Sequence, residues 1–319
     1  MLNRRILRIK AFKVLYSYAE NPAMTLKEAQ AQLEISCKST RSLYLFMLSI
    51  IPALTREAAA RIDAARQKFN PTEEEKNPNL KFVNNSLSHI IDEDPDFQKV
   101  IAKEKLSWEQ YDVLLRKLYD SVRSKDWFSA YMATPETSLS EEVKLFTHIF
   151  EEEFVDNQDL ADILEDLSIY WNDDLAYALT CCCRTLEGFA KGERWSLPPL
   201  YQSEMPGHKG QDSDQVFATT LLRTAFCGYQ SFFDKIASVV PKWDKDRLFI
   251  IDIVLIICGI AEAKAFPEIP VKVTINEYVD ISKYYSTPKS RSFVNGILDS
   301  VIQAMLADGS IVKSGRGLV

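Results

Sequence analysis

Glycine is absent from the first 187 of the 319 residues, because all ten glycines of the chain lie at or after Gly188. Sheet-rich folds need glycine in their tight turns far more than helical folds do. The absence argues against a β-rich fold and predicts helices joined by loops that proline and asparagine mark. Apolar residues recur with helical period between those loops, one instance being Phe97, Ile101, Trp108, Tyr111, Leu114, Leu115 and Leu118. We predict an all-α protein.

Histidine and cysteine are scarce and poorly placed for chemistry. None of the six cysteines forms a Cys-x-x-Cys pair or lies near one of the three histidines in a ligand-like spacing. The consecutive Cys181, Cys182 and Cys183 are interpreted as small buried residues of a helix in a reducing compartment, with a reactive thiol as the alternative. No catalytic Ser, His and Asp arrangement stands out, and no glycine-rich cofactor loop follows a strand. The sequence predicts no metal, no cofactor and no enzymatic activity, in a cytoplasmic protein.

Long hydrophobic runs are also missing. The most apolar stretch, from Leu248 to Ala261, is interrupted by Asp252 and is shorter than the ~20 residues that span a bilayer. At the N-terminus, Lys10 and Lys13 interrupt the segment that would have to be apolar in a signal peptide. We predict neither a membrane span nor a signal peptide.

The chain begins with a dense basic cluster, although its net charge is −7. No carboxylate precedes Glu20, and the cluster comprises Arg4, Arg5, Arg8, Lys10 and Lys13. An acidic protein with one concentrated basic end usually uses that end on a polyanion. We expect one helix here, with a buried stripe of Leu7, Ala11, Val14, Leu15 and Tyr18.

A second stripe of this helix carries Arg5, Arg8, Phe12 and Tyr16. It combines guanidinium groups for phosphates with aromatic faces on which unpaired bases can stack, as in the recognition of single-stranded RNA. The alternative is a solvated helix start. The acidic clusters within residues 70–175 are interpreted as solvated helix ends and faces that would repel RNA, so a nucleic-acid surface should avoid that region. Residues 197–214, rich in proline and glycine, form the clearest linker.

Two motifs resemble one family. The first helix reads Arg4-Arg5-x-x-Arg8-x-x-Ala11-x-x-x-Leu15-Tyr16-Ser17. Near the other end, Asp246-Arg247-Leu248 and Ile251-Asp252 precede KVTINEYV (residues 272–279) and SRSFVNGILD (residues 290–299). This arrangement resembles the NusB family of transcription antitermination factors over residues 1–20 and about 212–306.

The resemblance implies a NusB-like helical bundle of two packed helical halves, enlarged by a helical insert. We divide the chain into a basic N-terminal helix (residues 1–20), a helical extension or insert (21–204) and a C-terminal helical subdomain (205–319). Family members bind the boxA element of ribosomal RNA transcripts with a ribosomal small-subunit protein that acts as Nus factor E, in the antitermination complex of RNA polymerase.

Carried over residue by residue, the resemblance assigns RNA contacts to two helix segments. They comprise Arg4, Arg5, Arg8, Phe12 and Tyr16 in the first helix and Lys289, Arg291 and Phe293 at the start of the last. A helix N-terminus with added cations suits phosphate. The resemblance also places Asp252 near the protein partner. A helical scaffold that keeps the fold without RNA binding is the alternative function.

One departure from the family concerns the helix around Asp252, where Ile253 and Ile257 replace positions that are commonly basic. This helix is apolar nearly all round, so we expect it to be buried, with the added segment covering part of it.

The helix that follows Thr287-Pro288 should begin sharply at about Lys289. We expect Asn276 and Asn295 to form a buried amide pair, and Gly296 to allow a close approach of another backbone.

Overall fold

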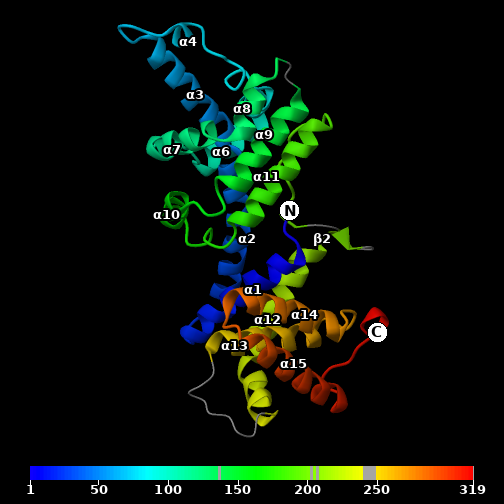
Figure 1. The fold of residues 1–319 in the computed structure, drawn as a ribbon. Helices are drawn as coiled ribbons and strands as arrows, with labels where there is room; N and C mark the ends of the chain where they lie inside the picture. Colours follow the sequence, from blue (N-terminus) through cyan, green and yellow to red (C-terminus); the bar gives the residue numbers. More distant parts are fainter. Residues whose placement is uncertain (136–137, 202–203, 206–207, 240–248, 319) are drawn as a thin grey trace. The chain divides into compact units, whose positions relative to one another are not determined.

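The computed structural model describes residues 1–135, 138–201, 204–205, 208–239 and 249–318, and Figure 1 shows its fold. The described chain is helical almost throughout, which confirms the all-α prediction. A short antiparallel ribbon of β1 (Glu204–Met205) and β2 (His208–Asp212) lies in the predicted linker. The motif residues Asp246, Arg247 and Leu248 lie outside the described residues.

Contacts within the chain divide it into two units of opposite charge. Unit 1 comprises residues 1–37 and 199–319, and unit 2 comprises residues 38–198. Unit 2 has 19 basic and 29 acidic side chains, whereas unit 1 has 19 basic and 16 acidic ones. The acidity of the whole protein therefore belongs to unit 2, and unit 1 carries a net charge of +3.

Unit 1 is built around one central helix. The elements of its bundle are α1 (Arg4–Glu20), α12 (Ser213–Val239), α13 (Ile250–Ala265), α14 (Val271–Tyr285) and α15 (Ser290–Ala307). Asn3 caps α1, since its side chain accepts a hydrogen bond from the backbone N–H of Ile6 at 3.0 Å. The predicted apolar stripe of α1 is buried, with Tyr18 partly exposed at its end.

The central helix α13 packs against α1, α12, α14 and α15, all of unit 1. Ile253 and Ile257 are buried, as predicted. These four helices lie outside residues 21–211, but residues 21–37 of the added segment also belong to unit 1, so its cover over Ile253 and Ile257 stays a prediction. Residues 252–263 of α13 are all buried, as expected for a helix that is apolar nearly all round.

The predicted amide pair is also contradicted, since Asn276 and Asn295 are both exposed. Gly296 faces open space, because a Cβ placed there would meet no atom within 4 Å. The close approach instead occurs at Gly259 in α13, where a Cβ would lie 2.6 Å from Cδ2 of Leu298. Gly259 therefore allows α13 and α15 to pack closely.

Unit 2 is a second helical assembly. It takes in the later part of α2 (Leu26–Leu48) and contains α3 (Ile50–Arg66), α4 (Glu73–Lys76), α5 (Ser86–Asp92), α6 (Pro95–Glu104), α7 (Asp112–Arg123), α8 (Asp126–Ala133), α9 (Leu139–Glu152), α10 (Gln158–Leu167) and α11 (Leu175–Ala190). Its core stacks Phe46 on Trp108, with ring centroids 4.0 Å apart. Trp108 lies between α6 and α7, so the apolar period predicted from Phe97 to Leu118 belongs to two helices.

Two further expectations concern burial. Cys181, Cys182 and Cys183 lie in α11, and burial raises the pKa of all three thiols, which supports their interpretation as helix residues of low reactivity. In the part of the chain that the structure describes, the helical run from Leu26 to Arg66 is long and apolar enough to cross a membrane. Since 72% of its most apolar window is buried inside the protein, it has the properties of a core helix.

Candidate nucleic-acid interface

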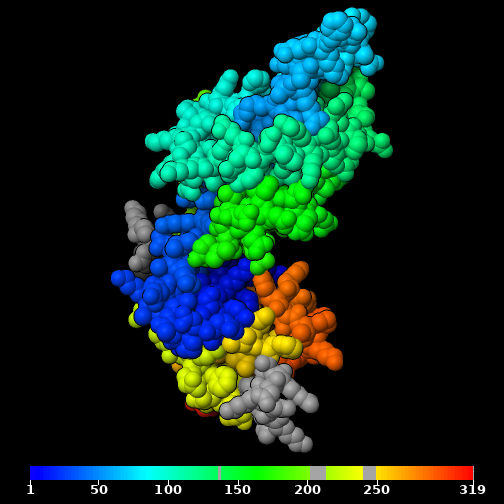
Figure 2. Space-filling view, turned by 90° about the vertical axis from the view of Figure 1, so that its left-hand side faces the viewer, coloured from blue at the N-terminus to red at the C-terminus, as the bar shows by residue number. Residues whose placement is uncertain are grey.

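Side chains of α1 reach α14, and their contacts follow the same order along both helices. Near the start of α1, Arg5 donates hydrogen bonds to Glu277 and Asp280 of α14. Two turns later, the ring of Phe12 lies 5.4 Å from that of Tyr285. In Figure 2 the dark-blue surface of the N-terminal segment borders the orange surface around α14 and α15, in agreement with these contacts.

Arg5 forms a network of ion pairs at the surface. Its Nε and Nη2 atoms each lie 3.1 Å from Glu277, and Nη2 lies 3.1 Å from Asp280. Hydrogen bonding to Glu277, helped by both carboxylate charges, raises the pKa of Arg5. The Arg5 side chain is nevertheless 46% exposed. Exposed ion pairs contribute only about 0–1 kcal/mol, so a phosphate can compete for this guanidinium.

Arg4 is also partly exposed, but it turns to α12 and not to α14. Its side chain is about half exposed, and Nε lies 3.4 Å from Oδ1 of Asp214 on α12. The guanidinium also lies over the ring of Phe217. Like Arg5, Arg4 is thus held at the surface by a carboxylate that an incoming anion would have to displace.

Arg8 faces the core instead. Its Nε and Nη2 atoms donate to the two oxygens of Glu262 at 2.7 and 2.9 Å, with both side chains buried. Burial opposes the charge on Arg8, but hydrogen bonds and the charge of Glu262 outweigh it and raise the pKa of the guanidinium. Arg8 therefore joins α1 to α13, which corrects the expectation that it faces RNA.

The carboxylate of Glu262 is saturated by four donors. Besides Arg8, Thr274 Oγ1 donates to it at 2.9 Å and the Tyr278 hydroxyl at 3.3 Å. Burial and the charge of Glu262 raise the pKa of Tyr278, so its hydroxyl keeps the proton that it donates. Glu262 thus ties together α1, α13 and α14. An isolated glutamate in an apolar helix was the available sequence signal, but it does not identify its partners.

Phe12 does not offer a free aromatic face. It is only 3% exposed and packs against Tyr285. The expectation that a base stacks on Phe12 therefore needs correction, because Tyr285 occupies that position. Tyr16, one turn later, is partly exposed. Of the two aromatic residues predicted in α1, only Tyr16 is accessible.

Exposed cations gather at the start of α15. Lys289 and Arg291 are exposed, and Phe293 is partly exposed. Tyr285 precedes Lys289 by four residues, which span at most about 14 Å of extended chain. Because Tyr285 contacts Phe12, the start of α15 must lie near the middle of α1. Lys13 adds a cation there, with Nζ 5.6 Å from the centre of the Tyr285 ring.

Asp252 fixes the start of α15 through two side-chain hydrogen bonds. Its two oxygens accept hydrogen bonds from Ser286 Oγ at 2.5 Å and from Ser290 Oγ at 2.7 Å. Asp252 is buried, so the expectation that it faces a protein partner is corrected. The helix begins at Ser290, whose backbone N–H donates to the carbonyl of Thr287, so the predicted boundary is accurate to within a residue.

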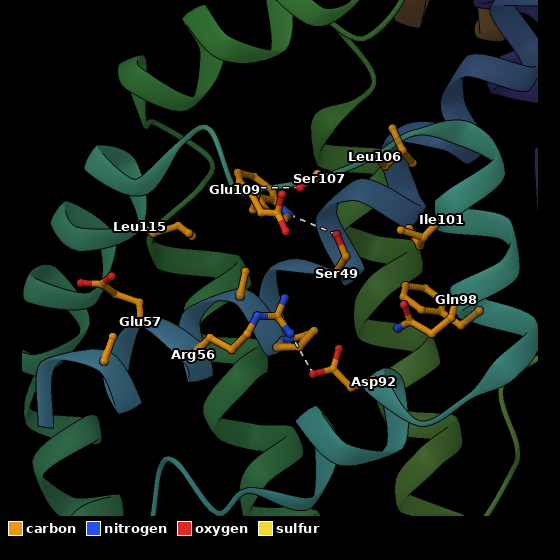
Figure 3. Close-up of a pocket in the computed structure, with 15 residues that line it drawn as sticks. Ser49, Arg56, Glu57, Asp92, Gln98, Ile101, Leu106, Ser107, Glu109 and Leu115 are labelled. Atoms are coloured by element: carbon orange, nitrogen blue, oxygen red, sulfur yellow. Dashed lines mark hydrogen bonds and ion pairs between the residues drawn. The ribbon is translucent and has the colours of Figure 1, made fainter. Parts of the chain in front are cut away.

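Unit 2 contains a separate pocket of about 290 Å³ between α3, α5, α6 and α7 (Figure 3). Its polar side chains already interact with one another, since Arg56 pairs with Asp92 at 2.8 Å and Trp108 donates to Ser49 at 3.1 Å. These four polar side chains of the pocket are therefore already paired within the protein.

The residues that could meet RNA form one exposed set on unit 1. We define the basic face as Arg5, Lys13, Tyr16, Lys289, Arg291 and Phe293. Arg4 is left out because it turns to α12, on the opposite side of α1 from Lys13. Five of these were predicted as contacts, and Lys13 is added by its position over Tyr285. The fold and this surface define an all-helical bundle that holds its first helix beside the start of its last.

Comparisons with known proteins agree with that class. The NusB family model matches residues 200–303, which lie within unit 1. The chain is 34% identical to the transcription antitermination protein NusB of Salinibacter ruber over 107 residues, 34% of this chain and 67% of that protein. It is 40% identical to the NusB of Chloroherpeton thalassium over 103 residues, 32% of this chain and 49% of that protein.

A third relative, the NusB of Methylacidiphilum infernorum, is 50% identical over 70 residues, 22% of this chain and 49% of that protein. The chain thus spans between about half and two thirds of the length of these relatives. No solved structure matches it significantly. The chain belongs to the NusB family, and unit 2 is an additional helical segment.

Proposed function

We propose that this protein is an RNA-binding transcription antitermination factor. It binds boxA-type single-stranded RNA in ribosomal RNA transcripts through the basic face of unit 1. It acts in the cytoplasm with the ribosomal small-subunit protein that serves as Nus factor E, in the antitermination complex of RNA polymerase. The relatives are named for transcription antitermination, and the partner and RNA are those that the family resemblance implies.

The observation that carries the proposal is the gathering of exposed cations in an otherwise acidic protein. Arg5, Lys289 and Arg291 come from two helices that are far apart in sequence and are brought close by the Phe12–Tyr285 contact. Unit 1 carries a net charge of +3, and unit 2, at −10, repels nucleic acid. Phosphate contacts from such cations provide most of the affinity for a nucleic-acid backbone.

A helical scaffold without RNA binding is the second candidate. The burial of Arg8 and Phe12 favours it, as does the pairing of Arg5 with two carboxylates. In that case the arginines of α1 serve packing alone. The two functions differ in one measurable property, since only phosphate binding makes RNA affinity depend on salt.

The proposal is tested by equilibrium binding of the full chain to boxA-type single-stranded RNA, with and without the ribosomal small-subunit protein. We expect binding that prefers boxA over a scrambled RNA and tightens when the protein partner is present. Equal affinity for both RNAs would refute boxA recognition. No binding under either condition would favour the scaffold.

Reversing charge at the start of α15 should weaken this binding. In a Lys289→Glu and Arg291→Glu variant, we expect a clear loss of affinity and a shallower salt dependence, by roughly 0.7 for each phosphate of a single strand that the variant no longer binds. The control is Lys272→Glu with Arg316→Glu, which makes the same charge change at exposed residues by the start of α14. Equal reductions in the two variants would show a response to net charge and contradict a defined face.

Removing a competing carboxylate should strengthen RNA binding. Asp280 accepts hydrogen bonds from Lys283 and Arg5, which hold its pKa below the ordinary value, so it is charged at neutral pH. In Asp280→Asn, one carboxylate no longer competes with RNA phosphate for Arg5. We expect RNA affinity to rise by up to about fivefold. Asp308→Asn, which removes an exposed carboxylate paired with Lys235, should leave RNA affinity unchanged. An unchanged affinity in Asp280→Asn would mean that Asp280 does not compete with phosphate for Arg5.

A further inference from the structure

An exposed tyrosine ends helix α14. Tyr284 is 84% exposed, whereas the neighbouring Tyr285 packs against Phe12. Aromatic rings of this size are usually at least partly buried, because burying them is favourable. An aromatic face left in water beside a cationic surface is what base stacking requires. Tyr284 was not singled out by any sequence motif.

Helix geometry places Tyr284 next to the Arg5 network. Residues 277, 280 and 284 are three or four positions apart, so they lie along one face of α14. Arg5 binds the first two of these residues, Glu277 and Asp280. With a rise of 1.5 Å per residue, Tyr284 lies about 6 Å beyond Asp280 along the helix axis. It is therefore one turn from the guanidinium that a phosphate can reach.

Cations lie on both sides of the tyrosine along the chain. Lys283 donates to Asp280 at 2.5 Å, and the exposed Lys289 follows Tyr284 by five residues. Tyr284 thus lies along the chain between the Arg5 site and the start of α15. An RNA strand held by both sets of cations would pass it. Alternation of cations with aromatic rings is typical of single-strand binding, because the cations hold phosphates and the rings stack on bases.

We infer that Tyr284 is a base-stacking residue for the bound RNA and takes the role that burial denies to Phe12. The ligand is an unpaired nucleobase whose neighbouring phosphates bind Arg5 and the start of α15. The inference rests on the proposed function. It adds a site residue and predicts that stacking, which is insensitive to salt, contributes to affinity beside the phosphate contacts.

The test compares Tyr284→Ala, Tyr284→Phe and the parent full-length chain on a boxA-type RNA over a range of salt concentrations. We expect Tyr284→Ala to lose roughly 5- to 150-fold in affinity, which is the range for one stacked base. The salt slope should stay at the parental value, because no phosphate contact is removed. Tyr284→Phe keeps the ring and should bind as the parent does. A fluorescent purine analogue in the RNA should be quenched by the parent and by Tyr284→Phe, but not by Tyr284→Ala.

Phe69→Ala provides the control. Phe69 is 99% exposed but belongs to the acidic unit 2, so its removal should leave RNA affinity unchanged. Parental affinity in Tyr284→Ala, or an equal reduction in Phe69→Ala, would overturn the stacking role while leaving the proposed function intact. A parent chain that binds RNA without salt dependence, or not at all, would instead refute the proposed function.

Discussion

Replacing Arg8 with alanine is expected to lower the free energy of unfolding of unit 1 by about 3–5 kcal/mol, the usual cost of leaving a buried charge without its partner. Glu262 is fully buried, and Arg8 is the cation that neutralises it with two hydrogen bonds. Hydrogen exchange of the α13 amides measures this destabilisation locally, because these amides are protected until unit 1 opens. Any weakening of RNA binding by Arg8→Ala would then follow from disrupted structure.

Two variants separate the ion pair from a general effect of charge. Arg5→Ala removes an exposed arginine from the same helix and should change stability by no more than about 1 kcal/mol. Arg8→Met combined with Glu262→Gln should be less damaging than Arg8→Met alone. Glutamine still accepts hydrogen bonds from Thr274 and Tyr278 but leaves no buried charge. Equal stability losses for Arg5→Ala and Arg8→Ala would contradict the structural role of Arg8.

Replacing Ile257 with arginine is expected to prevent unit 1 from folding. Ile257 is fully buried in α13, so the variant loses roughly 1.5–3 kcal/mol of apolar burial and places an unpaired charge in the core. We expect loss of helical circular dichroism and aggregation. Family members with basic residues at the matching positions would then have to leave that side of the helix exposed.

Val273→Arg is the matched control, because Val273 lies on α14 with 44% of its surface exposed. The same change in residue type should be tolerated there within about 0.5 kcal/mol. A folded Ile257→Arg protein with parental stability would show that α13 has a free face at this position and would contradict the burial of Ile257.

Local patterns in the sequence predicted most of the helical framework. The apolar stripe of α1 and the start of α15 depend on neighbouring residues alone, and both are found within one or two positions. The tertiary role of Arg8 and Phe12 could not be predicted in this way. They lie beside the buried stripe, where the helical period does not decide between core and solvent. Arg8 is buried by its pairing with Glu262 and Phe12 by its contact with Tyr285. Both partners are more than 250 residues away in the sequence.

The motif residues Asn276, Asn295 and Gly296 show the same limit. An amide or a glycine in a helix is compatible with either burial or exposure, and here all three are exposed. The sequence marks Asp252 as a carboxylate in an apolar helix, but its partners Ser286 and Ser290 lie in another helix and its preceding turn. A carboxylate within an apolar helix therefore indicates a buried acceptor without identifying its donors.

The dependence of RNA affinity on salt tests the central claim most directly. For the full chain and a boxA-type single strand, the account predicts that the logarithm of the association constant falls linearly with the logarithm of salt concentration. Contacts from Arg5, Lys289 and Arg291 give a slope of about −2, at roughly −0.7 for each phosphate contact. A slope near zero, or no binding at low salt, would contradict an RNA-binding role for this face.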